Sequence, residues 1–247
     1  MAEEPRFAIG VDGGASKTDA VVMSTHGRVL GRGRASGSNW ENVGLDGAVN
    51  AITRAVDAAL EQAGRARAEA AVSVFALAGV DWPGDHRRFT HALGLLGLGG
   101  AQFVTNDAFA ALRAGTSGQA GCVSSAGTGA VAAGRNEAGL TARTMAEGFG
   151  ELGGAGDIVE RAIWACARMR EASGPGTALA DALCAALAVR DLDSLFEGIK
   201  RNGLAVGADL APLVLDVAAR GDDVAQRLLE VQIVTSFWAT SKTSRWG

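Results

Sequence analysis

The sequence predicts an α/β protein with two domains, for two reasons. In the first half of the chain, short apolar segments that suit strands alternate with segments that have the apolar period of a helix. In addition, a strand, a tight glycine turn and a second strand occur at residues 9–23 and again at residues 122–133. Two copies of one device, far apart in the chain, indicate two domains of one architecture, which we place at residues 1–115 and 116–247.

The first glycine turn has the composition of a phosphate-binding loop. Gly13 and Gly14 lack the Cβ atoms that would hold a polyphosphate away from the backbone. Asp12 ends the preceding strand, where a carboxylate suits a Mg²⁺ ion held through water. Donors for phosphate oxygens follow at Ser16, Lys17 and Thr18. An ordinary Gly-Gly hairpin is the alternative, whereas the strand that follows, in place of a helix, excludes the Walker and Rossmann loops.

The remainder of the first domain alternates helices with strands. β-type segments at residues 19–23 and 28–34 complete a group of three strands. In the first expected helix, apolar residues recur at helical spacing from Val49 to Leu60, and Gly64 follows where a C-terminal glycine belongs. We expect helices at residues 45–62, 85–96 and 107–114, and strands at residues 71–77 and 102–105.

The second domain repeats the three strands and then becomes helical. Its glycine turn consists of Gly127, Thr128 and Gly129 between two apolar strands, and we expect it to face phosphate as the first turn does. The expected strands are residues 121–125, 129–135 and 140–145. The expected helices are residues 156–171, 177–189, 191–201, 205–220 and 222 to about 234.

Composition narrows the class of protein. The 247 residues carry a net charge of −4 without a basic cluster, which argues against nucleic-acid or anionic-membrane partners. No apolar run has the length of a membrane span, and the acidic start of the chain is unlike a signal peptide, so we expect a cytoplasmic protein. Three widely spaced cysteines, Cys122, Cys166 and Cys184, favour free thiols over disulfides or metal ligands.

Three short motifs occur in an order that resembles a known superfamily. They are Asp12-Gly13-Gly14 through Thr18, Asn106-Asp107-Ala108, and Ala126-Gly127-Thr128-Gly129. This ordered set is similar to the actin-like ATPase sugar kinases, and more narrowly to the N-acetylglucosamine kinase and BadF/BadG/BcrA/BcrD ATPase group. The resemblance covers residues 6 to about 170. It implies two ribonuclease-H-like domains that close a central cleft over ATP and Mg²⁺.

Asp107 is the catalytic candidate. It follows an expected strand and opens an expected helix, which puts its carboxylate at the sheet edge where open α/β folds bind ligands. In the kinases that the chain resembles, this aspartate takes the proton of the sugar hydroxyl, and phosphoryl transfer needs such an oriented alcohol. The alternative is that Asp107 only caps the helix.

The resemblance also implies a set of sugar contacts. An asparagine in the loop before the first long helix contacts sugar in these kinases, which points to Asn39, and Trp40 beside it suits stacking on a pyranose. A capping role for Asn39 and a packing role for Trp40 are the alternatives. The other substrate candidates are Gly79 and Asp81 in the loop after the fourth strand, and Asn106 next to the catalytic candidate. The alternative for Asp81 is that it only caps the segment that follows.

The chain departs from the family pattern in two places. A Gly-Asp-Glu-Gly-Ser motif is replaced by residues 148–157, so that Glu147 or Glu151 would have to supply its carboxylates for substrate binding. No late Gly-Gly loop, further strand or closing helix is visible after Gly221. We therefore expect the second domain to be short or truncated.

The leading functional hypothesis is ATP-dependent phosphorylation of a small sugar, with an amino or N-acetylamino sugar favoured. A BadF-type ATPase that activates a partner through an iron–sulfur cluster is disfavoured, because the cysteines fall in an expected strand and helices rather than in a loop. A catalytically weak, sugar-binding regulatory relative is the third hypothesis. Neither the identity of the sugar nor homodimer formation follows from the sequence.

Overall fold

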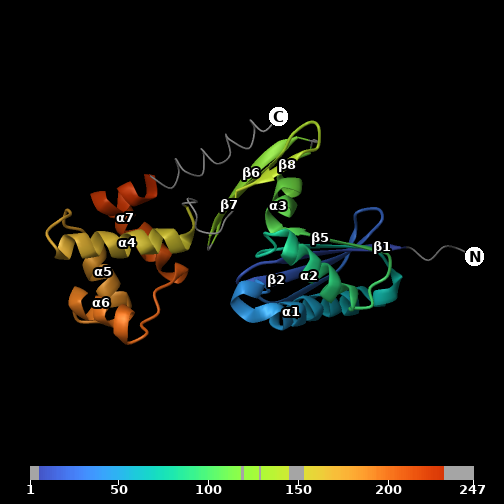
Figure 1. Cartoon of the computed structure of the whole chain (residues 1–247), viewed down its shortest axis with the longest axis horizontal. Coiled ribbons are helices and arrows are strands. Elements are labelled where there is room, and N and C mark those ends of the chain that lie inside the picture. Colours follow the sequence, from blue (N-terminus) through green and yellow to red (C-terminus); the bar gives the residue numbers. More distant parts are fainter. Residues whose placement is uncertain (1–5, 118–119, 128, 145–152, 231–247) are drawn as a thin grey trace, which may run out of the picture. The chain divides into compact units, whose positions relative to one another are not determined.

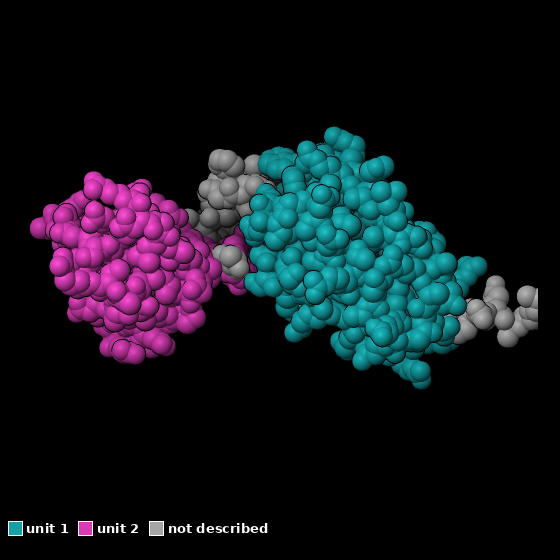
Figure 2. All heavy atoms as spheres, turned by 90° about the horizontal axis from the view of Figure 1, so that it is seen from below, with its two compact units in different colours: residues 1–118 teal, residues 119–247 magenta. Residues whose placement is uncertain are grey.

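An antiparallel hairpin begins the first unit of the protein. The computed structural model describes residues 6–117, 120–127, 129–144 and 153–230, and its contacts divide the chain into two units, residues 1–118 and 119–247 (Figure 2). Strands β1 (Phe7–Gly13) and β2 (Lys17–Ser24) pair so that Gly13 lies opposite Thr18. The turn between them is the first glycine turn predicted from the sequence.

Three further strands complete a mixed five-stranded sheet in unit 1. Strand β3 (Val29–Ser36) pairs antiparallel with β2, whereas β4 (Ala70–Leu77) and β5 (Ala101–Asn106) run parallel to β1. The strand order is β3-β2-β1-β4-β5. The carboxyl ends of β1, β4 and β5 therefore meet at one edge of the sheet.

Helices α1 (Trp40–Ala63) and α2 (Pro83–Gly94) share a hydrophobic core with this sheet. Ile52 of α1 and Phe89 of α2 are fully buried against strand residues such as Phe75. Helix α3 (Asp107–Gly115) packs on β4, β5 and β1. The α/β class predicted from the sequence is confirmed, and each expected helix and strand of this unit is present.

Unit 2 contains a small sheet and a group of helices. Strands β6 (Gly121–Ala126), β7 (Ala130–Arg135) and β8 (Thr141–Arg143) form an antiparallel sheet in that order. The helices share a second hydrophobic core, and residues 223–230 are also helical. They are α4 (Ala155–Arg170), α5 (Leu179–Ala186), α6 (Leu192–Arg201) and α7 (Ala211–Ala219) (Figure 1).

The expected helix at residues 205–220 is corrected by the structure. Residues 203–207 are not helical, residues Ala208–Leu210 form a 3₁₀ turn, and α7 begins only at Ala211, with a proline in its first turn. In the part of the chain that the structure describes, no helix has both the length and the apolar character needed to cross a bilayer.

Candidate functional site at the edge of the first sheet

The candidate site residues of unit 1 lie at or just after the ends of three parallel strands, and the last residues of these strands form one row of register partners. Gly13 of β1 is the register partner of Leu77 of β4, and Leu77 is the register partner of Asn106 of β5. Each strand ends at this row. The glycine turn, the loop that begins at residue 78 and the start of α3 consequently leave the sheet side by side, at the edge where open α/β folds bind ligands.

The glycine turn is closed by backbone hydrogen bonds and packed from behind. The amide of Gly14 donates to the carbonyl of Lys17 at 2.9 Å, and the Gly14 carbonyl accepts from the amides of Ser38 and Asn39 at 2.9 and 3.2 Å. A Cβ atom on Gly13 would lie 2.4 Å from the Ser38 hydroxyl oxygen. The backbone of the turn thus lies directly against the entry to α1, and only glycine fits at position 13.

The Thr18 hydroxyl makes its hydrogen bonds inside the protein. The side chain is fully buried, and its hydroxyl lies 2.7 Å from the carbonyl oxygen of Ser36 and 2.9 Å from the hydroxyl of Ser38. These bonds hold the end of β2 against the segment before α1. Among the three predicted donors, Ser16 and Lys17 are exposed, whereas the Thr18 hydroxyl is turned into the protein.

Lys17 belongs to an ion-pair cluster beside the turn. Its ammonium nitrogen lies 2.5 Å from the Asp19 carboxylate, which also accepts from the Arg34 guanidinium at 2.5 and 3.1 Å. The hydrogen bonds from Arg34 and Lys17 lower the pKa of Asp19. Two cations share one carboxylate here, so these three side chains together are positive, and the ionised carboxylate of Asp12, the register partner of Asp19, balances that charge.

Asp12 faces this cluster from the neighbouring strand. It is the register partner of Asp19. Asp12 is exposed at the surface. Partial loss of water around its carboxylate still raises the pKa of Asp12, while the Lys17 ammonium opposes this rise and the Asp19 carboxylate adds to it. Within the described residues, no group of three or more His, Cys, Asp or Glu side chains gathers as a metal cage. One carboxylate nevertheless fits Mg²⁺, which is commonly held by one or two carboxylates together with waters and substrate phosphates.

Asn39 and Trp40 stand at the start of α1. The Asn39 carboxamide oxygen accepts from the amide of Glu41 at 3.1 Å, so Asn39 caps the helix, as its alternative interpretation predicted. The Trp40 indole N–H donates to the carbonyl of Gly79 at 2.6 Å, and the Arg88 guanidinium lies 5.1 Å from the centre of its ring. Both side chains are therefore engaged with the protein next to the loop that carries Asp81.

Asn106 is the N-cap of α3, and Asp107 is the first residue of that helix. The Asn106 carboxamide oxygen accepts from the amide of Ala108 at 3.0 Å, and its amide nitrogen donates to Asp81 at 3.0 Å. The alternative in which Asp107 caps the helix is consequently wrong. Asp107 is half-buried at the sheet edge.

In unit 2, the second glycine turn lies at the start of α4. The Gly127 amide donates to the carbonyl of Gly129 at 2.8 Å, and the Gly127 carbonyl accepts from the amide of Ala155 at 2.8 Å. The turn thus lies beside the amino terminus of a helix, the end at which backbone amides attract phosphate. The sequence did not predict this contact. Three candidates of this unit, Thr128, Glu147 and Glu151, lie outside the described residues.

The cysteines are poorly placed to hold an iron–sulfur cluster. Cys166 and Cys184 are buried in the core of unit 2, and burial raises the pKa of Cys166 to about 12, with Cys184 and Asp222 adding to the rise. A thiol must lose its proton to ligate a metal. Cys122, on β6, is exposed.

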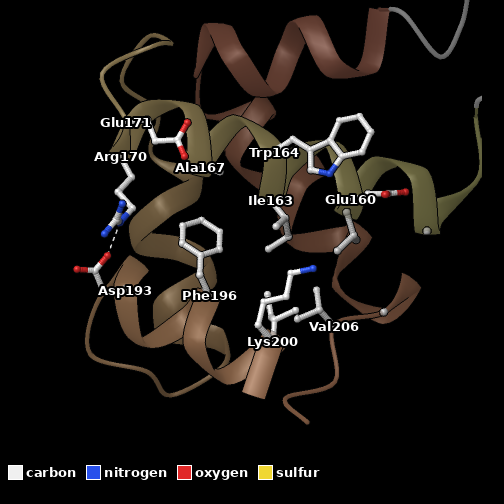
Figure 3. A pocket seen from close by; sticks show the side chains of 14 residues that line it. Glu160, Ile163, Trp164, Ala167, Arg170, Glu171, Asp193, Phe196, Lys200 and Val206 are labelled. Atoms are coloured by element: carbon white, nitrogen blue, oxygen red, sulfur yellow. Dashed lines mark hydrogen bonds and ion pairs between the residues drawn. The ribbon is translucent and has the colours of Figure 1, made fainter. Parts of the chain in front are cut away.

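A groove of about 900 Å³ lies in unit 2 between α4 and α6 (Figure 3). Apolar side chains such as Ile163 and Phe196 line it, and Trp164 is 60% exposed at its rim. Its charged lining comprises three carboxylates and two cations, Glu160, Glu171, Asp193, Arg170 and Lys200, of which Arg170 and Asp193 form an ion pair. This balance does not favour a phosphate, and none of the described site candidates lines the groove.

Four residues that support the site in unit 1 were missed from the sequence. Asp19 could have been found, because alternate residues of a strand share a face and thus put Asp19 beside Lys17. Arg34 meets Asp19 only through the pairing of β2 with β3. Asp85 follows the first position of α2 by two residues, where an acidic residue often bonds back to the preceding amides. No local pattern marks Ser38, because its contacts depend on the tertiary fold.

Comparison with known proteins gives one family and a consistent group of relatives. The model of the BadF/BadG/BcrA/BcrD ATPase family matches residues 9–230. An N-acetylmuramic acid/N-acetylglucosamine kinase from Clostridium acetobutylicum is 28% identical over 91% of this chain and 75% of its own length. An N-acetyl-D-glucosamine kinase from Dictyostelium discoideum is 29% identical over 90% of this chain and 74% of its own length.

Solved structures show the same fold. A protein from Chromobacterium violaceum, to which N-acetylglucosamine kinase activity has been attributed, matches 96% of this chain and 82% of its own with a TM-score of 0.77 and 23% identity. A ROK family glucokinase from Streptomyces griseus, solved with glucose and AMPPNP, matches 90% of this chain and 74% of its own with a TM-score of 0.50 and 18% identity.

Proposed function

This chain belongs to the BadF/BadG/BcrA/BcrD ATPase family and is a sugar kinase, and we propose that it transfers the γ-phosphoryl group of ATP to a hydroxyl of an amino or N-acetylamino sugar. One observation carries this proposal. The row formed by Gly13, Leu77 and Asn106 brings a phosphate-type turn and a carboxylate to the same sheet edge. A kinase needs both groups within reach of one substrate pair.

The glycine turn is assigned to the phosphates of ATP. Gly13 and Gly14 give the backbone close approach, while Ser16 and Lys17 remain exposed as donors. The cations Lys17 and Arg34 suit a polyanion beside the turn. In unit 2, Gly127 and Gly129 at the start of α4 suit a second set of phosphate contacts, with Thr128 of the same turn assigned to it from the sequence.

Asp12 is assigned to the magnesium ion, held through water. The ion would neutralise charge that develops on the phosphate oxygens. The raised pKa of Asp12 fits this role, because a bound cation favours the ionised carboxylate and offsets the cost of its partial dehydration.

Asp107 is assigned as the general base. In this proposal the carboxylate at the start of α3 accepts the proton of the sugar hydroxyl as the oxygen attacks phosphorus, while the bond to the leaving ADP oxygen breaks. The loop that carries Asp81 lies next to Asp107, because Asn106 joins the two. Asp81 is therefore assigned to a neighbouring sugar hydroxyl, with Asn39 at the start of α1 on the same side.

The substrate class is proposed from the relatives. Both curated relatives are named for N-acetylglucosamine, and one also for N-acetylmuramic acid. Their identities of 28% and 29% support the class of acceptor more than the individual sugar. Glu147 and Glu151 are the assigned sugar contacts from unit 2.

A coupled assay of ADP release tests the proposal. Purified protein with ATP and Mg²⁺ is given N-acetylglucosamine, N-acetylmuramic acid, glucosamine or glucose, each against a blank without sugar. We expect sugar-dependent ADP release with the amino and N-acetylamino sugars and least with glucose. Calorimetry with the same sugars separates the regulatory alternative, since binding without turnover would contradict the kinase and support a sugar-binding regulator.

A further inference from the structure

We propose that Trp40, Asp85 and Asn106 are positioning residues that clamp residues 78–81 between the glycine turn and Asp107. In this arrangement Trp40 and Asn106 act on the sugar through this loop rather than by touching it. This inference rests on the proposed function for its catalytic consequence, whereas the clamp itself is a property of the free protein.

The first anchor joins the loop to the glycine turn and to α1. The amide of Ala78 donates to the carbonyl of Gly13 at 2.8 Å, and the Trp40 indole N–H donates to the Gly79 carbonyl at 2.6 Å. Gly79 has φ +77°, and a Cβ atom there would lie 2.6 Å from the Asn39 carboxamide oxygen. The loop thus passes so close to the start of α1 that position 79 accepts only glycine.

The second anchor is the buried carboxamide of Asn106, which is 4% exposed. Its nitrogen donates to the Asp81 carboxylate at 3.0 Å and lies 3.5 Å from the Val80 carbonyl, while its oxygen accepts from the amide of Ala108 at 3.0 Å. One side chain therefore fixes both the carboxylate of Asp81 and the first turn of the helix that carries Asp107. Because this carboxamide is buried and bonded within the protein through both its oxygen and its nitrogen, we infer that it acts on the sugar through the loop.

The third anchor is Asp85, which is 5% exposed. One of its oxygens accepts from the amides of Trp82 and Asp81 at 2.9 and 3.3 Å, and the other accepts from Arg88 at 3.4 Å. Arg88 in turn lies over the ring of Trp40. The network is closed, because it runs from Trp40 through Arg88 and Asp85 to the loop and back to Trp40.

The clamp has a consequence for catalysis. Phosphoryl transfer depends mainly on positioning, and small displacements of reacting groups are costly in rate. Trp40 fixes the loop at Gly79, and Asn106 and Asp85 fix it at Asp81. The loop therefore keeps the carboxylates of Asp81 and Asp107 in a fixed position relative to each other. Loosening one anchor should change both the sugar KM and kcat, although no sugar contact has been removed.

Trp40→Phe tests the clamp, with Trp82→Phe as the matched control. The first change keeps an aromatic ring but removes the N–H that reaches Gly79. Trp82 is a neighbouring tryptophan, 50% exposed, whose indole makes no hydrogen bond among the described residues. In the free protein, we expect amide hydrogen exchange at residues 78–81 to become about fivefold faster in Trp40→Phe and to stay unchanged in Trp82→Phe.

A second variant separates the loop from the helix. Asn106→Asp keeps an oxygen that accepts from Ala108 but replaces the donor to Asp81 with a like charge. It should speed exchange in the loop and leave α3 at wild-type rates. Unchanged loop exchange in both variants would overturn the inference, as would equal acceleration in Trp82→Phe.

Kinetics then distinguish this inference from the proposed function. If the wild-type enzyme phosphorylates sugar, Trp40→Phe should raise the sugar KM and lower kcat severalfold. A raised KM with an unchanged kcat would indicate a direct sugar contact instead. If the wild type phosphorylates no sugar, the proposed function fails, and the exchange rates still decide whether the clamp exists.

Discussion

The two units use their polar side chains in different ways. In the described residues, the polar and charged residues that are buried all belong to unit 1, and four of these five, Thr18, Ser38, Asp85 and Asn106, bond to the segments at one sheet edge. In unit 2, Asp191 and Asp222 cap helices from half-exposed positions. Burying polar groups is costly unless their bonds are made, so their concentration at one edge marks where geometry is most tightly specified.

Among the variants that test this difference between the units, Gly13→Ala should have the largest effect on stability and on ATP binding. Its Cβ atom would lie 2.4 Å from the Ser38 hydroxyl oxygen and 2.6 Å from a Leu77 methyl carbon, both of which are fully buried. Overpacking of this kind costs about 1–3 kcal/mol, and the turn must shift to relieve it. We expect a lower denaturation midpoint together with loss of ATP binding measured by calorimetry.

Gly14→Ala is the matched control for that variant. The nearest atom to its added Cβ is the Lys17 carbonyl oxygen at 3.4 Å, an ordinary contact. This variant should keep the wild-type midpoint yet bind ATP more weakly, because its methyl group enters the space assigned to phosphate. Equal destabilisation of both variants would contradict the packing described for Gly13.

Asp222→Ala should lower stability by as much as Gly13→Ala or less, and its effect should be confined to unit 2. The Asp222 carboxylate accepts from the amides of Ala178 and Ala225 at 2.7 and 2.8 Å and from the Thr177 hydroxyl at 3.0 Å, so it ties the last helix to the start of α5. Its loss should cost about 1–2 kcal/mol. Hydrogen exchange should report the loss in α5 and in residues 223–230, and Asp223→Ala, which removes an exposed neighbour, should leave both unchanged.

Asp222 also gives unit 2 a pH dependence of known sign. Burial opposes its ionisation, but the hydrogen bonds from Ala225, Ala178 and Thr177 outweigh this and lower the pKa of Asp222. Its contribution is present above the unfolded pKa of about 3.9 and is lost as pH falls through the folded value. The difference between Asp222→Ala and the wild type should therefore shrink in acid.

Asp12→Asn should have the smallest effect on stability, and it should stabilise the protein, whereas Gly13→Ala and Asp222→Ala destabilise it. The pKa of Asp12 is raised in the folded state, so ionisation is less favourable there than in the unfolded chain. Above the unfolded pKa of about 3.9 the variant should be slightly more stable than the wild type, and in acid below this value the difference should vanish. Its Mg²⁺-dependent activity should nevertheless fall. A destabilised variant at neutral pH would contradict the dehydration of Asp12.

The sequence predicted the strands and turns of unit 1 well because their signals are local. The start of α1 was less accurate, since the apolar period begins at Leu45 whereas the Asn39 cap begins the helix at Trp40, with a non-helical Gly44 between them. Local patterns also could not show that the Thr18 hydroxyl and the Asn106 carboxamide are turned inward. Those orientations depend on Ser38 and Asp81, which reach the edge from other segments.

The central claim is that Asp107, held at the edge of the first sheet, deprotonates the sugar hydroxyl. The most direct test is the sugar-dependent kcat of Asp107→Asn at saturating ATP and sugar, with wild-type loop exchange confirming an intact clamp. A general base commonly contributes a factor of about 10² to 10⁴, so we expect kcat to fall by at least about a hundredfold while ATP affinity is unchanged. An unchanged kcat in a folded, ATP-binding variant would contradict the account.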